Sequence, residues 1–461
     1  MIQIDVLPDE VLLGIFDFYE DTVDLSFFNR KPRIEAWQKL VHVCRRWRDL
    51  VFWSPRRLNL RLYCTPETPV RDRLDIWPAL PLLVNVDMTQ TLSSGMDNII
   101  AALGQSNRVS QVNLWGSRLG NVLPLMQVPF PELTDLRLSS RDRDNIPDTF
   151  LGGSAPRLRR LELNFISFPG LPKLLLSATH LVELHLRDIP YSGAIVPSLT
   201  TLSNLKSLTL NLEHSPPYPD WEIRSLPQPK RSILPALTEF HFDGLIEYLE
   251  ELVTRIKTPQ LDKMYITFYR PTDFDFDCSR LIQFINRTPT LRALDEAHVE
   301  FHDLNAILRL RYQTSDVNSH SLPIDISCRN LHRQPSSIEQ ICNPSLYLLS
   351  TVEDLYIELR YFHRVWNDAV GKDQWLELFL PFIAVKNLYL SKEFAPCIAA
   401  ALQELVGDRI TEVLPNLQNI FVKELEPSGP FQENIGQFVA ARQLSNHSIA
   451  ISVTVWHETP T

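Results

Sequence analysis

Most of the chain repeats one short pattern of apolar and polar positions, L-x-x-L-x-L, in which other apolar residues can replace leucine. The first copies begin at Val109, Leu133, Leu158, Leu181 and Leu205, so their starts are 23 to 25 residues apart. This alternation indicates a strand with one buried face, and a period of ~20–29 residues is typical of arrays that pair a strand with a helix. Later copies are more widely spaced and begin at Leu237, Leu261, Val352, Val385 and Leu417.

Segments with helical periodicity separate the later strands. In residues 245–256, Leu245, Leu249 and Leu252 fall on one side of a helix, as in an amphipathic helix packed on a sheet. Similar segments span residues 280–286, 373–383, 395–406 and 432–444. Strands that alternate with helices predict a parallel sheet with helices on one side, so the fold class is predicted to be α/β.

The repeat pattern weakens in the middle and changes near both ends. Leu291 begins a degenerate copy, Leu-Arg-Ala-Leu, and residues 321–328 are predicted to form an irregular strand before the copy at Val352. Residues 57–63 and 82–88 alternate like strands. We expect these two segments to form a hairpin-like cap, since the end of a repeat array must be covered. Residues 448–456 are expected to be the closing strand at the other end.

The first 60 residues have a helical pattern instead. Pro8 suits the first turn of a helix. The residues after it form one apolar stripe at helical spacing: Val11, Leu12, Ile15, Phe16 and Tyr19. A second helix is predicted over residues 35–51, and its apolar residues cover more than one face. Such an excess of apolar surface indicates a contact with another protein; a helical cap packed on the repeats is the alternative.

Two segments of this helical region carry a family resemblance. Leu7-Pro8-Asp9-Glu10-Val11-Leu12 begins the first helix, and Cys44-Arg45-Arg46-Trp47-Arg48-Asp49-Leu50 lies in the second. Together they resemble the F-box, a helical module that joins a protein to a cullin–RING ubiquitin ligase, and with the repeats they are similar to the fungal-type F-box/leucine-rich-repeat family. The resemblance implies an N-terminal all-α F-box followed by an α/β leucine-rich-repeat solenoid, with parallel strands on the concave side and helices on the convex side.

The resemblance also implies a function. The chain would be the substrate-recognition subunit of an SCF-type ubiquitin ligase, with the F-box on the Skp-type adaptor and the repeats on an unknown protein target. A leucine-rich-repeat scaffold or ligand sensor without a ligase role is the alternative. The implied domains are residues 1–56 (F-box), 57–90 (connecting segment and cap) and 91–461 (repeats). The residues implied to bind the adaptor are Leu7, Pro8, Val11, Leu12, Ile15, Phe16, Leu40, Val43, Cys44, Trp47 and Leu50.

Composition limits the other classes of function. Apolar residues make up 44% of the 461 residues, which excludes a disordered chain. The formal net charge of −10 and the absence of a basic tail argue against nucleic acid as a partner. No apolar run approaches the ~20 residues of a membrane span, and no signal peptide is recognised. The 6 scattered cysteines, without C-x-x-C, predict reduced thiols in the cytoplasm or nucleus.

Candidate catalytic and cofactor chemistry is weak. No G-x-S-x-G occurs, and residues 273–278 begin like a calcium loop but lack its glycine and its bidentate glutamate. His298 and His302 are four residues apart, with Glu300 between them, but they do not form H-E-x-x-H. We interpret both histidines as structural. The sequence therefore predicts no enzymatic activity, no cofactor and no metal.

A target-binding surface is predicted on the strands. The position between the last two apolar residues of each copy points away from the core by strand alternation. Along the chain this position is Arg137, Glu162, His185, Thr209, His241, Tyr265, Asp295, Tyr356, Tyr389 and Phe421. It changes from mostly polar to mostly aromatic, and aromatic residues are enriched at interface hot spots. Tyr265, Tyr356, Tyr389 and Phe421 are therefore the candidate target-binding residues; the alternative is that loops cover them.

Overall fold

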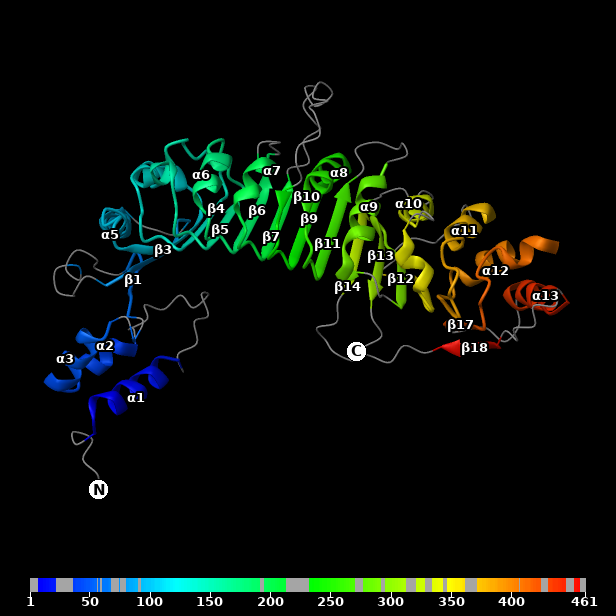
Figure 1. Ribbon diagram of the computed structural model, residues 1–461, viewed down its shortest axis with the longest axis horizontal. Helices are drawn as coiled ribbons and strands as arrows, with labels where there is room; N and C mark the ends of the chain where they lie inside the picture. Colours follow the sequence, from blue (N-terminus) through cyan, green and yellow to red (C-terminus); the bar gives the residue numbers. More distant parts are fainter. Residues whose placement is uncertain are drawn as a thin grey trace. The chain divides into compact units, whose positions relative to one another are not determined.

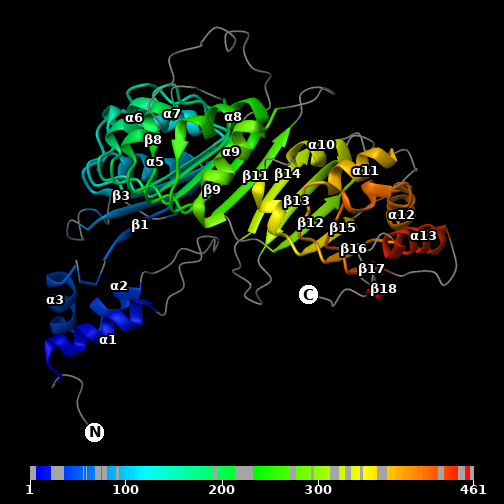
Figure 2. The ribbon, with the colours of Figure 1, turned by 45° about the vertical axis from the view of Figure 1, so that its right-hand side comes forward.

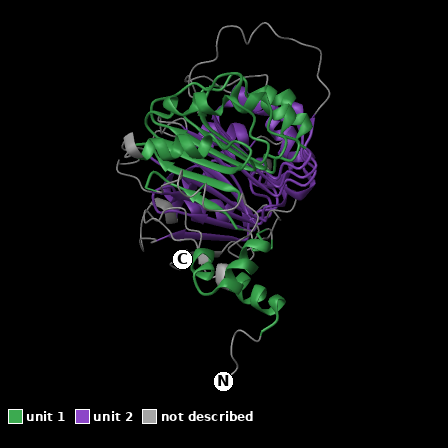
Figure 3. Cartoon of the chain, turned by 90° about the vertical axis from the view of Figure 1, so that its left-hand side faces the viewer, with its two compact units in different colours: residues 1–202 green, residues 203–461 purple. Residues whose placement is uncertain are grey.

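The computed structural model describes most of the chain, in segments. These are residues 7–21, 36–55, 57–58, 60–67, 74, 80–89, 93–190, 195–212, 232–269, 277–291, 295–311, 321–327, 334–342, 346–360, 371–405, 407–423, 430–444 and 452–456. The chain divides into two compact units, residues 1–202 and 203–461 (Figure 3). Within the described residues, no helix is both long enough and apolar enough to span a membrane.

Unit 1 begins with the helices α1 (Asp9–Asp21), α2 (Ala36–Val41) and α3 (Arg45–Trp53). The prediction of one continuous helix over residues 35–51 is wrong. The backbone of Cys44 is extended, and its sulfur accepts a hydrogen bond from the N–H of Trp47 at 3.5 Å, so Cys44 caps α3. Cysteine is not among the favoured capping residues, which is why the sequence pattern did not reveal the break.

The strands of unit 1 form a parallel sheet in chain order. They are β1 (Leu62–Cys64), β2 (Leu82–Asp87), β3 (Val109–Gly116), β4 (Asp135–Ser140), β5 (Arg160–Asn164) and β6 (Glu183–Ile189). The expected hairpin-like cap is wrong, because β1 and β2 are parallel, with Leu62 opposite Leu82. A parallel pair needs a crossover of about a dozen residues or more, and residues 65–81 supply that length.

Helices and short 3-10 segments follow these strands. They are α5 (Ser93–Leu103), η2 (Leu119–Asn121), η3 (Leu123–Gln127), η4 (Phe150–Gly153), α6 (Leu171–Ser177), α7 (Ile195–Ser198) and η5 (Leu199–Thr201). The alternate apolar residues of the strands, such as Leu161 and Leu163, are buried. The side chains between them are partly exposed, so the alternation predicted from the sequence is confirmed.

Unit 2 continues the same alternation of strands and helices. Its parallel strands are β7 (Ser207–Leu212), β9 (Glu239–Leu245), β11 (Lys263–Tyr269), β15 (Asp354–Leu359), β16 (Asn387–Leu390), β17 (Asn419–Lys423) and β18 (Ser452–Trp456). The short strands β8 (Ser232–Ile233) and β10 (Ile256–Lys257) pair separately. The predicted repeat strands are confirmed here, and the closing strand is confirmed over Ser452–Trp456; residues 448–451 of that prediction lie outside the described residues.

The helices of unit 2 are α8 (Ile246–Arg255), α9 (Ser279–Arg287), α10 (Gln334–Ile341), α11 (Lys372–Phe379), α12 (Ala395–Gln403) and α13 (Pro430–Leu444). The 3-10 segments are η7 (Pro289–Leu291), η9 (Tyr347–Thr351) and η10 (Gly407–Thr411). Figures 1 and 2 show α8 to α12 along one side of the strands. We call the other side, toward which the polar and aromatic side chains of the strands point, the open face of unit 2.

The chain reverses direction inside this sheet, where the repeat pattern is weakest. Strands β12 (Glu296–Phe301) and β13 (Asn305–Arg311) form an antiparallel hairpin, and β14 (Ser321–Ser327) is antiparallel to β13 and parallel to β11. The spatial order is therefore β11, β14, β13, β12, β15. The prediction of a strand at residues 321–328 is confirmed, but the sequence analysis missed β13. The reversal places β12 directly beside β15.

Candidate functional site

The interior of the N-terminal helices uses several residues that were predicted to bind an adaptor. Leu12 and Phe16 of α1 are fully buried, and the rings of Phe16 and Trp47 lie 4.8 Å apart. Leu40 and Leu50 are also buried. Arg46 joins α3 to the start of α1 by donating to Asp9 Oδ1 at 2.6 Å and to the carbonyl of Leu7 at 2.7 Å. These four residues and Trp47 therefore belong to the core of the N-terminal helices, together with Trp37, Val41 and Val51.

A second apolar stripe on the same helix faces solvent. Val11 and Ile15 of α1 are exposed, and Phe18, which the sequence analysis overlooked, is 73% exposed. These three residues have the i, i+4, i+7 spacing of one helix face. Val43, in the turn between α2 and α3, is exposed, and Trp53 at the end of α3 is 84% exposed. The remaining predicted residues are Pro8, which is exposed, and Leu7 and Cys44, which are partly exposed.

The open face of unit 2 carries a row of stacked rings. The strand register places His298 opposite Tyr356, Tyr356 opposite Tyr389, and Tyr389 opposite Phe421. Successive ring centroids are 4.3, 4.1 and 4.6 Å apart, with interplanar angles of 4°, 6° and 10°. We call these four residues the stacked row. Each inner ring has a neighbour on both faces, and Tyr356, Tyr389 and Phe421 remain partly exposed.

Two sequence predictions about this row need correction. Asp295 was placed at the outward position of the degenerate copy, but Asp295 precedes β12 and His298 occupies that position. Tyr265 was grouped with the later aromatic residues, but it stacks on His241 at 4.3 Å instead. Pro323 of β14 and Arg309 of β13 stand between the two stacks in the strand register. The hairpin therefore divides the aromatic surface in two.

A polar ladder runs beside the stacked row. Asn387 Nδ2 donates to Asp354 Oδ1 at 2.7 Å, and Asn419 Nδ2 donates to Asn387 Oδ1 at 2.7 Å. Burial raises the pKa of Asp354, and it also raises the pKa of Tyr356. These hydrogen bonds join Asp354, Asn387 and Asn419 across three neighbouring strands. They hold these three side chains in place next to the aromatic rings.

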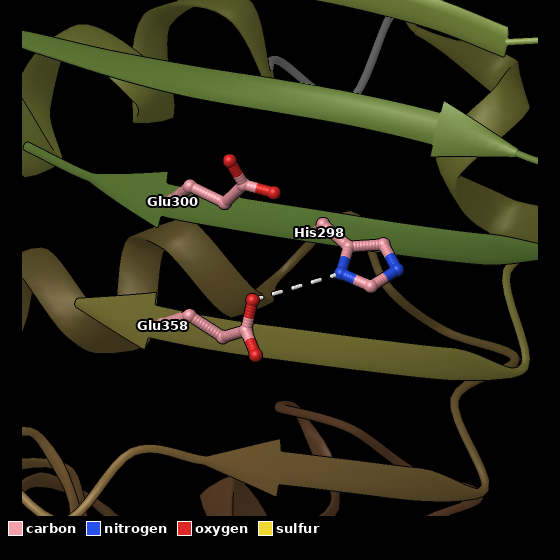
Figure 4. A group of neighbouring side chains, drawn as sticks. All are labelled: His298, Glu300 and Glu358. Atoms are coloured by element: carbon pink, nitrogen blue, oxygen red, sulfur yellow. Dashed lines mark ion pairs between the residues drawn. The ribbon is translucent and has the colours of Figure 1, made fainter. Parts of the chain in front are cut away.

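On the other side of the row lie Glu300 and Glu358, which form a cluster with His298 of the row (Figure 4). His298 and Glu300 come from β12 and Glu358 from β15, and only 8%, 4% and 4% of these residues are exposed. His298 Nε2 is 2.5 Å from Glu296 Oε1, and His298 Nδ1 is 3.9 Å from Glu358 Oε2. We call His298, Glu300 and Glu358 the His–Glu–Glu cluster.

Two arginines neutralise part of the cluster. Arg360 Nη2 donates to Glu358 Oε2 at 2.7 Å, and Arg309 Nη1 donates to Glu300. Burial alone would raise the pKa of Glu358, but the nearby His298 and Arg360 hold it below the usual value. Burial would lower the pKa of His298, but the carboxylates of Glu296 and Glu358 raise it. Burial alone would also raise the pKa of Glu300, but His302 and Arg309 hold it below the usual value, so Glu300 and Glu358 are ionised at neutral pH.

The sequence analysis noticed His298, Glu300 and His302 but not Glu358. On a strand, residues two apart share a face, so His298 and Glu300 share the open face. His302 comes just after β12, and its Nε2 lies 3.6 Å from Glu300 Oε2. Glu358 is 58 positions after Glu300 and becomes its neighbour only through the pairing of β12 with β15. The sequence analysis interpreted both histidines as structural, and the tertiary structure places a second carboxylate, that of Glu358, beside His298.

Comparison with known proteins adds little. No family model matches the chain, and no curated protein matches it. Among solved structures, the leucine-rich-repeat-containing protein LegL7 from Legionella pneumophila is similar at 14% sequence identity, covering 82% of this chain and 97% of that chain, with a TM-score of 0.24. A likeness at that TM-score carries no argument about this chain.

Proposed function

We propose that the chain is a substrate-recognition subunit of an SCF-type ubiquitin ligase that acts in the cytoplasm or nucleus. The N-terminal helices would bind a Skp-type adaptor, and the open face of unit 2 would bind a protein target. The observation that carries this proposal is the outward stripe on α1, with Val11, Ile15 and Phe18 exposed beside a complete inner stripe. An exposed apolar surface of this kind is typical of a protein contact.

The exposed stripe changes which residues we expect to contact the adaptor. Leu12, Phe16 and Trp47 pack inside the module, so truncating them tests folding more than adaptor binding. Ile15 and Phe18 test the contact itself, because little core packing depends on an exposed side chain. The adaptor role of the exposed residues Pro8, Val11, Ile15 and Val43 stays a prediction.

The direct test is binding of the purified full chain to a purified Skp-type adaptor. Replacing a central anchor residue typically costs about 2 kcal/mol, roughly thirtyfold in affinity. We expect losses of that order for Phe18→Ala and Ile15→Ala. Leu176→Ala is the matched control, since Leu176 is an exposed apolar residue on α6, and it should leave adaptor binding unchanged.

A leucine-rich-repeat scaffold without a ligase role is the second candidate. It is favoured if the stacked row and its polar ladder bind a partner while the wild-type chain does not bind the adaptor. The same measurement separates the two candidates, because only the ligase subunit requires an adaptor. For the target surface, crosslinks from a trapped target should fall on the open face around Tyr356 and Tyr389 rather than on the helices. We propose no catalytic role.

A further inference from the structure

The His–Glu–Glu cluster has the donor atoms of a metal site. Ligand atoms from His298, Glu300 and Glu358 all lie within 4.8 Å of one another, and this is the group of such residues found among those that the structure describes. Two hydrogen-bonded strands, β12 and β15, hold all three. Figure 4 shows the three side chains on the same face of these strands. A site carried on paired strands is more rigid than one carried on loops.

The orientation of His298 is an independent sign of a ligand. More than nine-tenths of this residue is buried, and its Nδ1 atom is inaccessible and makes no hydrogen bond. At 3.9 Å, Glu358 Oε2 is too far from Nδ1 for one. The other ring nitrogen is held by Glu296. A histidine with one nitrogen on a carboxylate and the other aimed at a shared centre is the usual second-shell arrangement of a metal ligand.

The charges around the cluster leave room for a cation. A histidine that ligates a metal is neutral, so the ion would replace the proton that the carboxylates favour on His298. With His298 in this form, the carboxylates outnumber the guanidinium groups by one; the groups concerned are Glu296, Glu300, Asp354 and Glu358 against Arg309, Arg311 and Arg360. An ionised carboxylate has two oxygens and about four lone-pair positions. Arg309 and Arg360 therefore leave acceptor capacity on Glu300 and Glu358.

We propose that the His–Glu–Glu cluster binds a divalent transition-metal ion. His298 Nδ1 would supply a nitrogen ligand, and Glu300 and Glu358 would each supply an oxygen. Glu296, Arg309 and Arg360 would orient these ligands from behind. Imidazole favours zinc and its transition-metal neighbours over calcium and magnesium, which prefer oxygen ligands alone. The proposal does not depend on the ligase function.

The chain contains its own matched control. On β9, Glu239, His241 and Asp243 repeat the spacing of Glu296, His298 and Glu300, and His241 stacks on a tyrosine in the same way. One difference separates the two places. The residue opposite Asp243 on the next strand is Thr267, whereas Glu358 stands opposite Glu300. The group around His241 therefore lacks a carboxylate equivalent to that of Glu358.

The test is calorimetric titration of the full chain with zinc chloride, with cobalt absorption spectra as a second readout. We expect His298→Ala and Glu358→Gln each to lower zinc affinity by at least about tenfold, and Glu296→Gln by about tenfold as a residue that positions His298. His241→Ala should retain the wild-type affinity. Glu358→Gln keeps the shape of the side chain, so it remains informative if His298→Ala does not fold.

Three outcomes would overturn the proposal. The first is a wild-type chain that binds no zinc. The second is zinc affinity that is equal in wild type, His298→Ala and Glu358→Gln, which would place the ion elsewhere. The third is calcium binding as tight as zinc binding and equally sensitive to Glu358→Gln, which would indicate an oxygen site without the imidazole. Circular dichroism on each variant separates lost binding from lost folding.

Discussion

The N-terminal helices and the open face of unit 2 depart from the usual distribution of side chains in opposite ways. The helices expose the large apolar residues Phe18 and Trp53, whereas the open face buries the charged residues Glu300 and Glu358. Exposed large apolar groups and buried charges are the informative cases, since isolated apolar residues at the surface are normal. The first departure is expected of a surface that a partner covers, and the second of charges that neutralise one another or hold a cation.

The largest expected effect separates the two apolar stripes of α1. Phe16→Ala should lower the free energy of unfolding of the module by about 3–5 kcal/mol, because it empties a fully buried site against Trp47. Phe18→Ala, two residues along, should change it by no more than about 0.5 kcal/mol, as for an ordinary surface position. Urea unfolding followed by tryptophan fluorescence gives both values. Equal losses for the two variants would mean that Phe18 is covered within the chain.

The next effect tests whether the buried charges depend on one another. Arg309→Ala removes a partner of Glu300 and leaves a buried carboxylate short of positive charge. Breaking a fully buried pair costs about 3–5 kcal/mol, and the partly exposed Arg309 should cost less, about 2 kcal/mol. Lys372→Ala is the control, because Lys372 and Glu404 form a pair with both side chains 51% exposed. Its loss should be at most about 1 kcal/mol. Thermal unfolding of both variants measures the two losses, and a loss for Lys372→Ala as large as that for Arg309→Ala would contradict the prediction.

The stacked row should stabilise unit 2 most at a ring that has a stacking partner on each of its two faces. Tyr389 has stacking partners on each side, Tyr356 and Phe421, whereas Tyr265 stacks on His241. A ring pair contributes about 0.5–1.5 kcal/mol beyond its buried area. Tyr389→Ala should therefore destabilise unit 2 by about 1 kcal/mol more than Tyr265→Ala. Denaturant midpoints at a common slope provide the measurement, and a larger loss for Tyr265→Ala would contradict the importance of the continuous stack.

The smallest effect is a pH dependence of stability from an ion pair between β5 and β6 of unit 1. The hydrogen bond from Arg160 lowers the pKa of Glu183. A carboxyl whose pKa is lowered in the folded state stabilises the fold above its unfolded pKa, near 4.5, and loses this contribution as the pH falls through its folded pKa. Glu183→Gln should cost less than about 1 kcal/mol at neutral pH, since both side chains are partly exposed. The difference from wild type should vanish in acid, as unfolding series from neutral to acidic pH would show.

Local pattern predicted the repeat strands well. The apolar positions at Leu133, Leu136 and Leu138, for example, are all buried, with β4 over residues 135–140. The prediction failed where a local signal was unusual or a long-range pairing was needed. Cys44 caps α3, three residues after α2 ends at Val41, and cysteine is not a recognisable cap signal. The alternating residues Ala306, Leu308 and Leu310 signal β13, but the L-x-x-L-x-L template does not include them.

The sequence by itself determined the parts whose information is local. The period of the apolar residues specifies strands with one buried face and amphipathic helices between them, because burying those faces is the main stabilising contribution. It also specified that aromatic residues follow one another on the outward positions of the late strands, at Tyr356, Tyr389 and Phe421.

Only the tertiary structure decided which of these residues meet. Helix geometry places Phe16 and Phe18 on different faces of α1, about 200° apart, but only the packing of α1 against α3 determined that the stripe with Phe16 is buried and the stripe with Phe18 is exposed. The reversal through β12, β13 and β14 brought His298 beside Tyr356 and Glu300 beside Glu358. Strand register is set by pairing between distant segments, and no local pattern in a single sequence records that choice.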